Sequence, residues 1–203
     1  MFQVRIHGRG GQGVVTAAEM LSVAAFTEGR HAQAFPSFGS ERTGAPVVAF
    51  CRIDDRPIRL REPIVHPDAV IIQDPTLLRQ IDVLSDLDDD GYLLVNSAKS
   101  AHQLGIGEIA ARLRPERLIT VPATDVARET VGRPLPNAVL LGGFAALTGV
   151  ISLESLSAAI RATFSGSVAD GNVAGAERAY AAVLDQITGD RTQGPVMAGA
   201  QAG

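Results

Sequence analysis

Gly8-Arg9-Gly10-Gly11-Gln12-Gly13 is the stretch that decides the fold. It follows an alternating apolar run over residues 2–7, which predicts a strand, and it leads into an apolar stripe over residues 11–27, which predicts a helix. The glycines satisfy the G-x-G-x-x-G pattern, in which the backbone turns tightly and N–H groups at a helix N-terminus meet a phosphate or a carboxylate. The stretch therefore predicts a Rossmann-like strand, turn and helix that face an anion or a partner surface.

Two other interpretations of this turn remain open, namely a purely structural turn and a complete dinucleotide site. A dinucleotide site needs an acidic ribose acceptor after the second strand, but Pro36-Ser37-Phe38-Gly39 follows that strand. Glu28 has the right distance but lies at the predicted end of a helix. Only His7 is positioned close to the turn as a candidate catalytic group.

Beyond the turn, short apolar runs alternate with helical patterns, which is typical of an α/β domain. Turn residues at 54–57 separate two strand-like runs and predict an antiparallel hairpin inserted into an otherwise parallel sheet, so we expect a mixed sheet. We expect one Rossmann-like domain over residues 1–188 with a helical C-terminal part, and a disordered tail over residues 189–203. The predicted strands are residues 2–7, 33–35, 46–53, 57–60, 69–73, 92–96 and 118–121, and the later helices are residues 137–148, 153–164 and 172–187.

Composition excludes several classes of protein. The formal net charge of the 203-residue chain is −4, so it has no positive excess with which to bind nucleic acid. No apolar run is long enough to span a membrane and no signal peptide is evident, so we expect a cytoplasmic protein without a membrane span. The single cysteine, Cys51, excludes an internal disulfide or a thiolate-built cluster, and its apolar surroundings predict a buried thiol. Lys99, the only lysine, lies in a polar stretch and is expected at the surface.

A second informative stretch is the long connection over residues 35–46. It combines two aromatic residues, Phe35 and Phe38, with small hydroxyl side chains and the pair Glu41-Arg42. This composition suits a binding loop on a rigid scaffold, although a solvated loop is the alternative.

Taken together, these stretches resemble the gamma subunit of the 2-oxoacid:acceptor oxidoreductases, the pyruvate:ferredoxin oxidoreductase family. The resemblance covers roughly residues 1–180 and rests on several strings that occur in order: residues 7–13, 33–42, 44–46, 52–59, 73–78 and 137–142. Thr43 departs from the family, which usually carries a second basic residue or a glycine after Arg42.

The resemblance implies a division of labour among subunits. In the family, alpha and beta subunits hold thiamine diphosphate and Mg2+, a ferredoxin-like delta subunit holds iron–sulfur clusters, and the gamma subunit packs beside the thiamine and coenzyme A sites. The complex would oxidatively decarboxylate a 2-oxoacid, such as pyruvate or phenylglyoxylate, to acyl-CoA and CO2, and would reduce ferredoxin or another acceptor such as NAD. The chain alone is expected to be inactive, with no cofactor, no metal and no catalytic residue of its own.

The alternatives to a gamma subunit beside coenzyme A are a purely structural assembly subunit and a free-standing nucleotide-binding oxidoreductase.

Within this chain we expect two groups of site residues. The expected anion or coenzyme A side comprises Gly8, Arg9, Gly10, Gly11, Gln12 and Gly13, and the expected interface with partner subunits comprises Phe38, Ser40, Glu41, Arg42 and Asn137.

Overall fold

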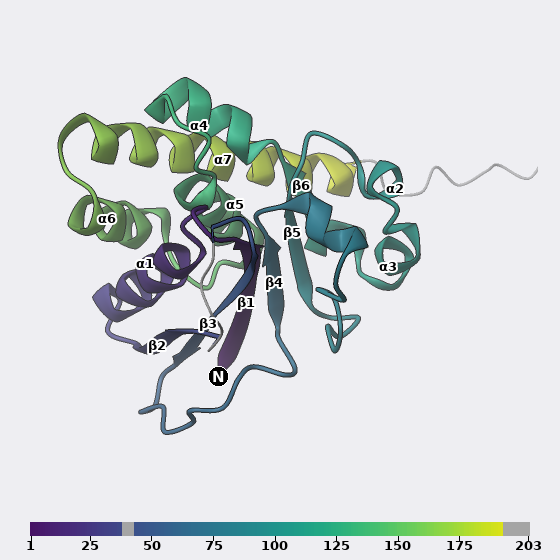
Figure 1. Ribbon diagram of the computed structural model, residues 1–203, viewed down its shortest axis with the longest axis horizontal. Helices are drawn as coiled ribbons and strands as arrows, with labels where there is room; N and C mark the ends of the chain where they lie inside the picture. The colour runs from purple at the N-terminus through teal and green to yellow at the C-terminus, as the bar shows by residue number, and fades with distance from the viewer. Residues whose placement is uncertain (38–42, 193–203) are drawn as a thin grey trace, which may run out of the picture.

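The computed structural model describes residues 1–37 and 43–192, and within them the chain forms a six-stranded sheet (Figure 1). The central strand β1 (Phe2–Arg9) is antiparallel to β3 (Pro46–Asp54) on one side, and it is parallel to β4 (Ala69–Ile72) on the other. The prediction of a mixed sheet is therefore confirmed. In spatial order the strands are β2 (His31–Pro36), β3 (Pro46–Asp54), β1 (Phe2–Arg9), β4 (Ala69–Ile72), β5 (Tyr92–Asn96) and β6 (Leu118–Val121).

The inserted hairpin lies at a different place from the predicted one. Residues 57–60 form no strand, so the prediction of a hairpin around residues 54–57 is wrong. Arginine side chains from the sheet bind the carbonyl groups of the following segment: Arg52 donates to Glu62 O at 2.6 Å and Arg5 to Val65 O at 3.4 Å. These contacts hold the segment after residue 60 against the sheet through side chains. The antiparallel hairpin is formed by β2 and β3.

Helices cover the two faces of the sheet unequally. The larger apolar core joins one sheet face to α1 (Val14–Thr27), α4 (Ala123–Val131), α5 (Asn137–Thr148), α6 (Leu153–Thr163) and α7 (Gly166–Thr192). The smaller core joins the other face of β4 and β5 to η1 (Pro75–Arg79), α2 (Ala101–Leu104) and α3 (Gly107–Arg112), and a short turn η2 (Pro115–Arg117) precedes β6. Ile71 belongs to the larger core and Ile72 to the smaller one, as alternation along a strand requires.

Several helix bounds differ from the predicted ones. The first helix begins at Val14 because Gly11 and Gly13, with φ of 92° and 69°, have left-handed backbone conformations that end the turn. The last helix, α7, is longer than predicted at both ends, since it runs from Gly166 to Thr192. Helix α4, together with the short α2 and α3, was not predicted.

Helix α5 is the centre of the helical layer and is buried along most of its length. Its small residues allow α7 to approach closely. A Cβ atom added at Gly142 would lie 2.1 Å from the backbone oxygen of Ala176, so only glycine fits at this crossing. The close approach of α5 and α7 fixes the layer that packs behind β1 and β5.

Candidate functional site

The glycine turn joins the carboxyl end of β1 to the start of α1. The parallel strands β1, β4 and β5 end at the same edge of the sheet, at the top of Figure 1. The chain leaves β1 toward β2 on one side, whereas β4 lies on the other side of β1. In open α/β sheets, ligands bind outside the carboxyl ends of the strands where the order switches in this way. The turn therefore lies where the fold places a binding site.

A cavity of about 240 Å³ opens at this turn, and Gly11, Val15 and Thr16 are among the residues that line it. Among residues 1–37 and 43–192, no side chain caps α1, and the first turn of α1 contains no acidic residue. Among the described residues, the backbone N–H groups of Val14, Val15 and Thr16 therefore have no acceptor. Free N–H groups and the helix dipole make this end of α1 attractive to an anion.

Gly10 lines the same cavity but has a different role. Its N–H donates to Ala45 O at 2.9 Å, and its carbonyl accepts a hydrogen bond from the N–H of Gly44 at 3.2 Å. Gly10 therefore ties the turn to the segment that precedes β3, and its own N–H is not available to a ligand. Among the described residues, the donors that remain open are the N–H groups of Gly11 and Gly13 and those of the first residues of α1.

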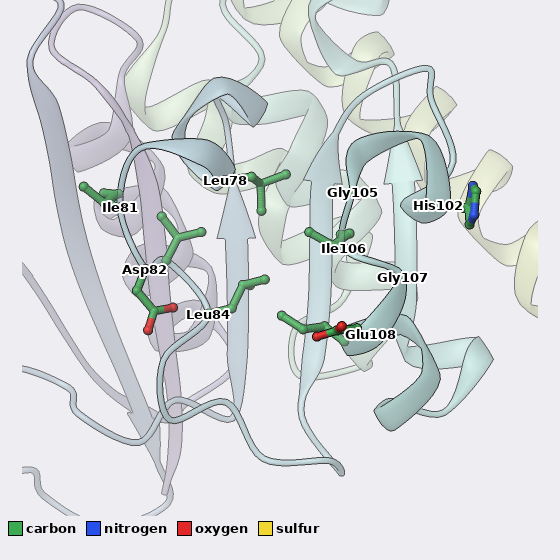
Figure 2. Close-up of a pocket in the computed structure, with 11 residues that line it drawn as sticks. Leu78, Ile81, Asp82, Leu84, His102, Gly105, Ile106, Gly107 and Glu108 are labelled. Carbon is green, nitrogen blue, oxygen red and sulfur yellow. The ribbon is translucent and has the colours of Figure 1, made fainter.

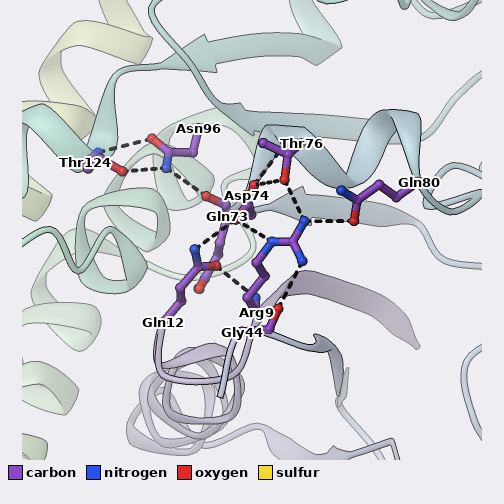
Figure 3. Close-up of polar contacts among 9 residues, drawn as sticks. All are labelled: Arg9, Gln12, Gly44, Gln73, Asp74, Thr76, Gln80, Asn96 and Thr124. Carbon is purple, nitrogen blue, oxygen red and sulfur yellow. Dashed lines mark hydrogen bonds and ion pairs between the residues drawn. The ribbon is translucent and has the colours of Figure 1, made fainter. Parts of the chain in front are cut away.

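Arg9 and Gln12, which were expected on the anion side, support the turn from within (Figure 3). Arg9 Nε donates to Asp74 Oδ2 at 3.0 Å, and Gln12 Nε2 donates to the same oxygen at 3.0 Å. The other guanidinium nitrogens of Arg9 donate to Gly44 O at 3.0 Å and to the side chains of Thr76 and Gln80, each at 2.8 Å. Internal acceptors thus engage the guanidinium of Arg9 and give it a supporting role in the turn, and contact of its side chain with an anion stays a prediction.

Asp74 is the residue that joins these contacts, and it was not singled out in the sequence. Burial alone would raise the pKa of its carboxyl, but hydrogen bonds from Thr76 and Gln12 and the charge of Arg9 lower that pKa overall. The string Asp74-Pro75-Thr76 carries the signal for a helix start, because Asp74 accepts from Thr76 N at 3.0 Å as the N-cap of η1. The sequence signal indicated that Asp74 caps η1, but it did not indicate the contacts of Asp74 with Arg9 and Gln12.

Gly8, Gly13 and Asn137 form a packed layer under the turn. A Cβ atom at Gly8 would lie 2.6 Å from Val14 Cγ2, and one at Gly13 would lie 2.6 Å from Asn137 Nδ2. Asn137 was expected at a partner interface, but it is only 4% exposed and its amide donates to Gly13 O at 3.5 Å. It therefore supports the turn from inside. Asn137 is also the first residue of α5, whose N-terminus, like that of α1, has no capping side chain in the described part of the chain.

Gln73 is a further buried polar residue next to the turn. It follows β4 and is 1% exposed. Its Cβ atom would lie 3.2 Å from a Cβ atom added at Gly8. Neither atom of its side-chain amide has a hydrogen-bond partner among the described residues. Figure 3 shows its side chain beside that of Gln12. This buried amide was not singled out from the sequence either.

The other expected interface residues, Phe38, Ser40, Glu41 and Arg42, lie outside the described residues. The segments on both sides of them are anchored near the turn. Ser37 N donates to Val48 O at 2.8 Å, and the segment after residue 42 is bound to Gly10.

The two remaining reactive side chains are buried. Burial and the nearby charge of Arg5 lower the pKa of His7 to about 4, so its imidazole is neutral at pH 7. Burial raises the pKa of the Cys51 thiol to about 12, and the prediction of a buried thiol is confirmed. Across residues 1–37 and 43–192, no three His, Cys, Asp or Glu side chains gather as a metal site, and no helix is long and apolar enough to cross a bilayer.

Comparisons with known proteins converge on one family. A family model described as pyruvate ferredoxin/flavodoxin oxidoreductase matches residues 3–182. The common gamma subunit of the pyruvate/ketoisovalerate oxidoreductases of Pyrococcus abyssi is 47% identical over 182 residues, which cover 89% of this chain and 96% of that subunit.

Solved structures give the same result for the fold. The pyruvate oxidoreductase subunit PORC of Thermotoga maritima aligns with a TM-score of 0.74 at 36% identity, over 89% of this chain and 95% of that one. The 2-oxoglutarate:ferredoxin oxidoreductase of Magnetococcus marinus, solved with 2-oxoglutarate, coenzyme A and succinyl-CoA bound, aligns with a TM-score of 0.67. That alignment covers 93% of this chain and 31% of the larger one, and its 16% identity shows a shared fold only.

Proposed function

Because the chain belongs to the pyruvate ferredoxin/flavodoxin oxidoreductase family as a gamma subunit, we propose that its glycine turn binds the phosphate groups of coenzyme A within the assembled oxidoreductase. The observation that carries this proposal is the uncapped N-terminus of α1, whose first three N–H groups lack acceptors among the described residues beside a cavity of about 240 Å³. The N-terminus of α5, which reaches the turn through Asn137, adds a second helix dipole of the same sign.

The reaction of the complex is the oxidative decarboxylation of a 2-oxoacid, with transfer of electrons to ferredoxin or another acceptor and of the acyl group to coenzyme A. We propose pyruvate as the first substrate to test, because the Pyrococcus and Thermotoga relatives are named for it. A ketoisovalerate-type or an aromatic acid such as phenylglyoxylate is the next to test. The Magnetococcus oxidoreductase, which shares the fold, was solved with coenzyme A.

The residues described here do not fit the other cofactors of the family. The one thiol, Cys51, is fully buried, so it cannot hold an iron–sulfur cluster. Asp170-Gly171-Asn172 contains the Asp and the Asn of a thiamine diphosphate-binding motif, but at the wrong spacing. It lies within α7, where Gly171 packs against the backbone of Thr130, and so it forms no diphosphate loop. We therefore assign thiamine diphosphate, Mg2+ and the clusters to the alpha, beta and delta subunits.

Two other functions are alternatives to coenzyme A binding at the glycine turn. A free-standing nucleotide-dependent oxidoreductase would need a catalytic group at the turn, and the nearest candidate, His7, is buried and neutral. A purely structural subunit is the stronger alternative, because the internal contacts of Arg9 and Gly10 hold the turn without any ligand. The segment over residues 38–42 is proposed from its sequence to contact the partner subunits in either case.

Replacing Thr16 by aspartate is expected to separate these alternatives. Thr16 lines the cavity in the first turn of α1, where a carboxylate interacts favourably with the helix dipole and keeps the chain folded. The same charge repels a bound phosphate. We therefore expect the KM for coenzyme A of the reconstituted complex to rise about tenfold or more, with little change in the KM for the 2-oxoacid.

Thr16→Asn is the matched control, because it has nearly the same shape without the charge. It should leave both KM values close to those of the wild type. Equal KM values for coenzyme A in wild type and Thr16→Asp would reject ligand binding at the turn and favour the structural alternative. Thermal unfolding of each variant shows whether the chain is intact.

A further inference from the structure

A second, larger cavity lies between η1 and α2, beyond the carboxyl ends of β4 and β5. Its volume is about 550 Å³, within the range of about 300–1,000 Å³ that is typical of small-molecule sites. It is separate from the cavity at the glycine turn, but the two share a wall, because Thr76 and Gln80 of this cavity bind the guanidinium of Arg9.

The charged side chains that line this cavity are both positive. Arg79 and Lys99 are exposed, and neither forms an ion pair with a described carboxylate. No aspartate or glutamate is among the described residues that line the cavity, although the whole chain carries 22 acidic residues. The cavity is therefore a positive site on an acidic protein, and its charge is left uncompensated within the part of the chain that the structure describes.

The neutral polar groups of the cavity also present donors. Gln80 Oε1 accepts from Arg9 at 2.8 Å and Gln103 Oε1 accepts from Ser100 N at 3.0 Å, which leaves the two amide NH2 groups without described acceptors. Ser97 Oγ accepts from Lys99 N at 2.9 Å, which leaves its hydroxyl hydrogen free to donate. A ligand rich in acceptors complements this set.

The rest of the lining is apolar, with Pro75, Ala98 and Leu104 contributing to it. Such a surface suits the flat or apolar body of a small molecule rather than a bare hydrated ion.

A neighbouring cavity of about 450 Å³ has the opposite character (Figure 2). Its lining includes the apolar side chains of Leu78 and Ile106, but also the carboxylates of Asp82 and Glu108. The positive charge is thus particular to the cavity between η1 and α2 and does not extend over this side of the sheet.

We infer that the cavity between η1 and α2 binds a phosphorylated small molecule of mononucleotide size. The phosphate lies against Arg79 and Lys99, and the body of the ligand packs on Pro75 and Leu104. This site is distinct from the glycine turn and does not depend on the function proposed for it.

Lys99 makes the inference testable by chemical labelling, because it is the only lysine of the chain. Its acetylation by an N-hydroxysuccinimide ester is followed by mass spectrometry on the full chain, with the α-amino group of Met1 as the internal reference. Adenosine 5′-monophosphate should slow the reaction at Lys99 about tenfold at saturation, and adenosine should not. Inorganic phosphate should protect only at much higher concentration.

Matched variants show whether the nucleotide that protects Lys99 from acetylation binds in this cavity. Arg79→Gln should abolish most of the protection by adenosine 5′-monophosphate, whereas Arg133→Gln, an exposed arginine outside the cavity, should leave it intact. Thr16→Asp should also leave it intact, which separates this site from the glycine turn.

Three results would overturn the inference. The first is equal reactivity of Lys99 with and without the nucleotide. The second is equal protection by adenosine or by inorganic phosphate alone, since recognition of both parts is required. The third is a Lys99 that is already unreactive in the assembled oxidoreductase without any nucleotide, because a partner subunit would then fill the cavity.

Discussion

Gly142→Ala is expected to destabilise the chain by about 3 kcal/mol or more, although alanine is the better helix former. The added methyl group would lie 2.1 Å from the backbone oxygen of Ala176 and 2.6 Å from its Cα, and backbone atoms cannot rotate away as a side chain can. Helices α5 and α7 would have to separate, and the layer behind the sheet would loosen with them. Urea unfolding followed by circular dichroism measures the loss.

Gly143→Ala on the same helix is the matched control. Its added Cβ atom would lie 3.3 Å from a methyl group of Val183, which can shift slightly, and helix propensity offsets the cost. We expect a change of less than about 1 kcal/mol. Similar unfolding free energies for the two variants would mean that α5 and α7 do not approach as closely as described.

Asp74→Asn is expected to have the second largest effect, a loss of about 2–3 kcal/mol at pH 7. The carboxylate accepts from Arg9, Gln12 and Thr76, so the neutral amide leaves a partly buried guanidinium without its charge partner. Because Arg9 holds the glycine turn in place through its hydrogen bonds, the turn should become more mobile in this variant. Hydrogen exchange at the amides of the turn should therefore quicken in the variant.

The pH dependence of stability provides an independent check on Asp74. Its pKa is lower in the folded chain than in the unfolded one, so the carboxylate stabilises the fold above a pH of about 4 and that stabilisation is lost as the pH falls through the folded value. Asp74→Asn should lack this part of the acid destabilisation.

Asp125→Asn is the control for Asp74, because the carboxylate of Asp125 is exposed and its one ion-pair partner among the described residues is Arg128 of the same helix. It should cost less than about 0.5 kcal/mol. Parallel stability curves for the wild type and Asp74→Asn between pH 7 and pH 3 would contradict the role assigned to Asp74.

Local signals account for the parts of the fold that could be predicted. The glycines of the turn mark where β1 ends and α1 begins, and both elements form next to them. Residues 57–60 were predicted wrongly as a strand because both edges of β3, the strand that they follow, are already paired with β2 and β1. Helix α4 was missed although Pro122 and Asp125 mark its start.

The contacts within the candidate site were harder to predict from the sequence than the strands and helices. A sequence does not reveal whether a polar side chain in a turn faces a ligand or a group of its own chain. Arg9 meets Asp74, 65 residues away, and Asn137 meets Gly13, 124 residues away. Both were expected on the surface of the site, and both contacts depend on tertiary packing that no local pattern encodes.

The most direct test of the account is the 2-oxoacid- and coenzyme A-dependent reduction of an electron acceptor, measured for three preparations: the chain alone, the complex without it, and the complex with it added back. We expect no turnover by the chain alone, which should also contain no thiamine, iron or sulfide, little acyl-CoA from the depleted complex, and restored activity after addition. Turnover by the chain alone, or full activity of the complex without it, would contradict its role as a gamma subunit.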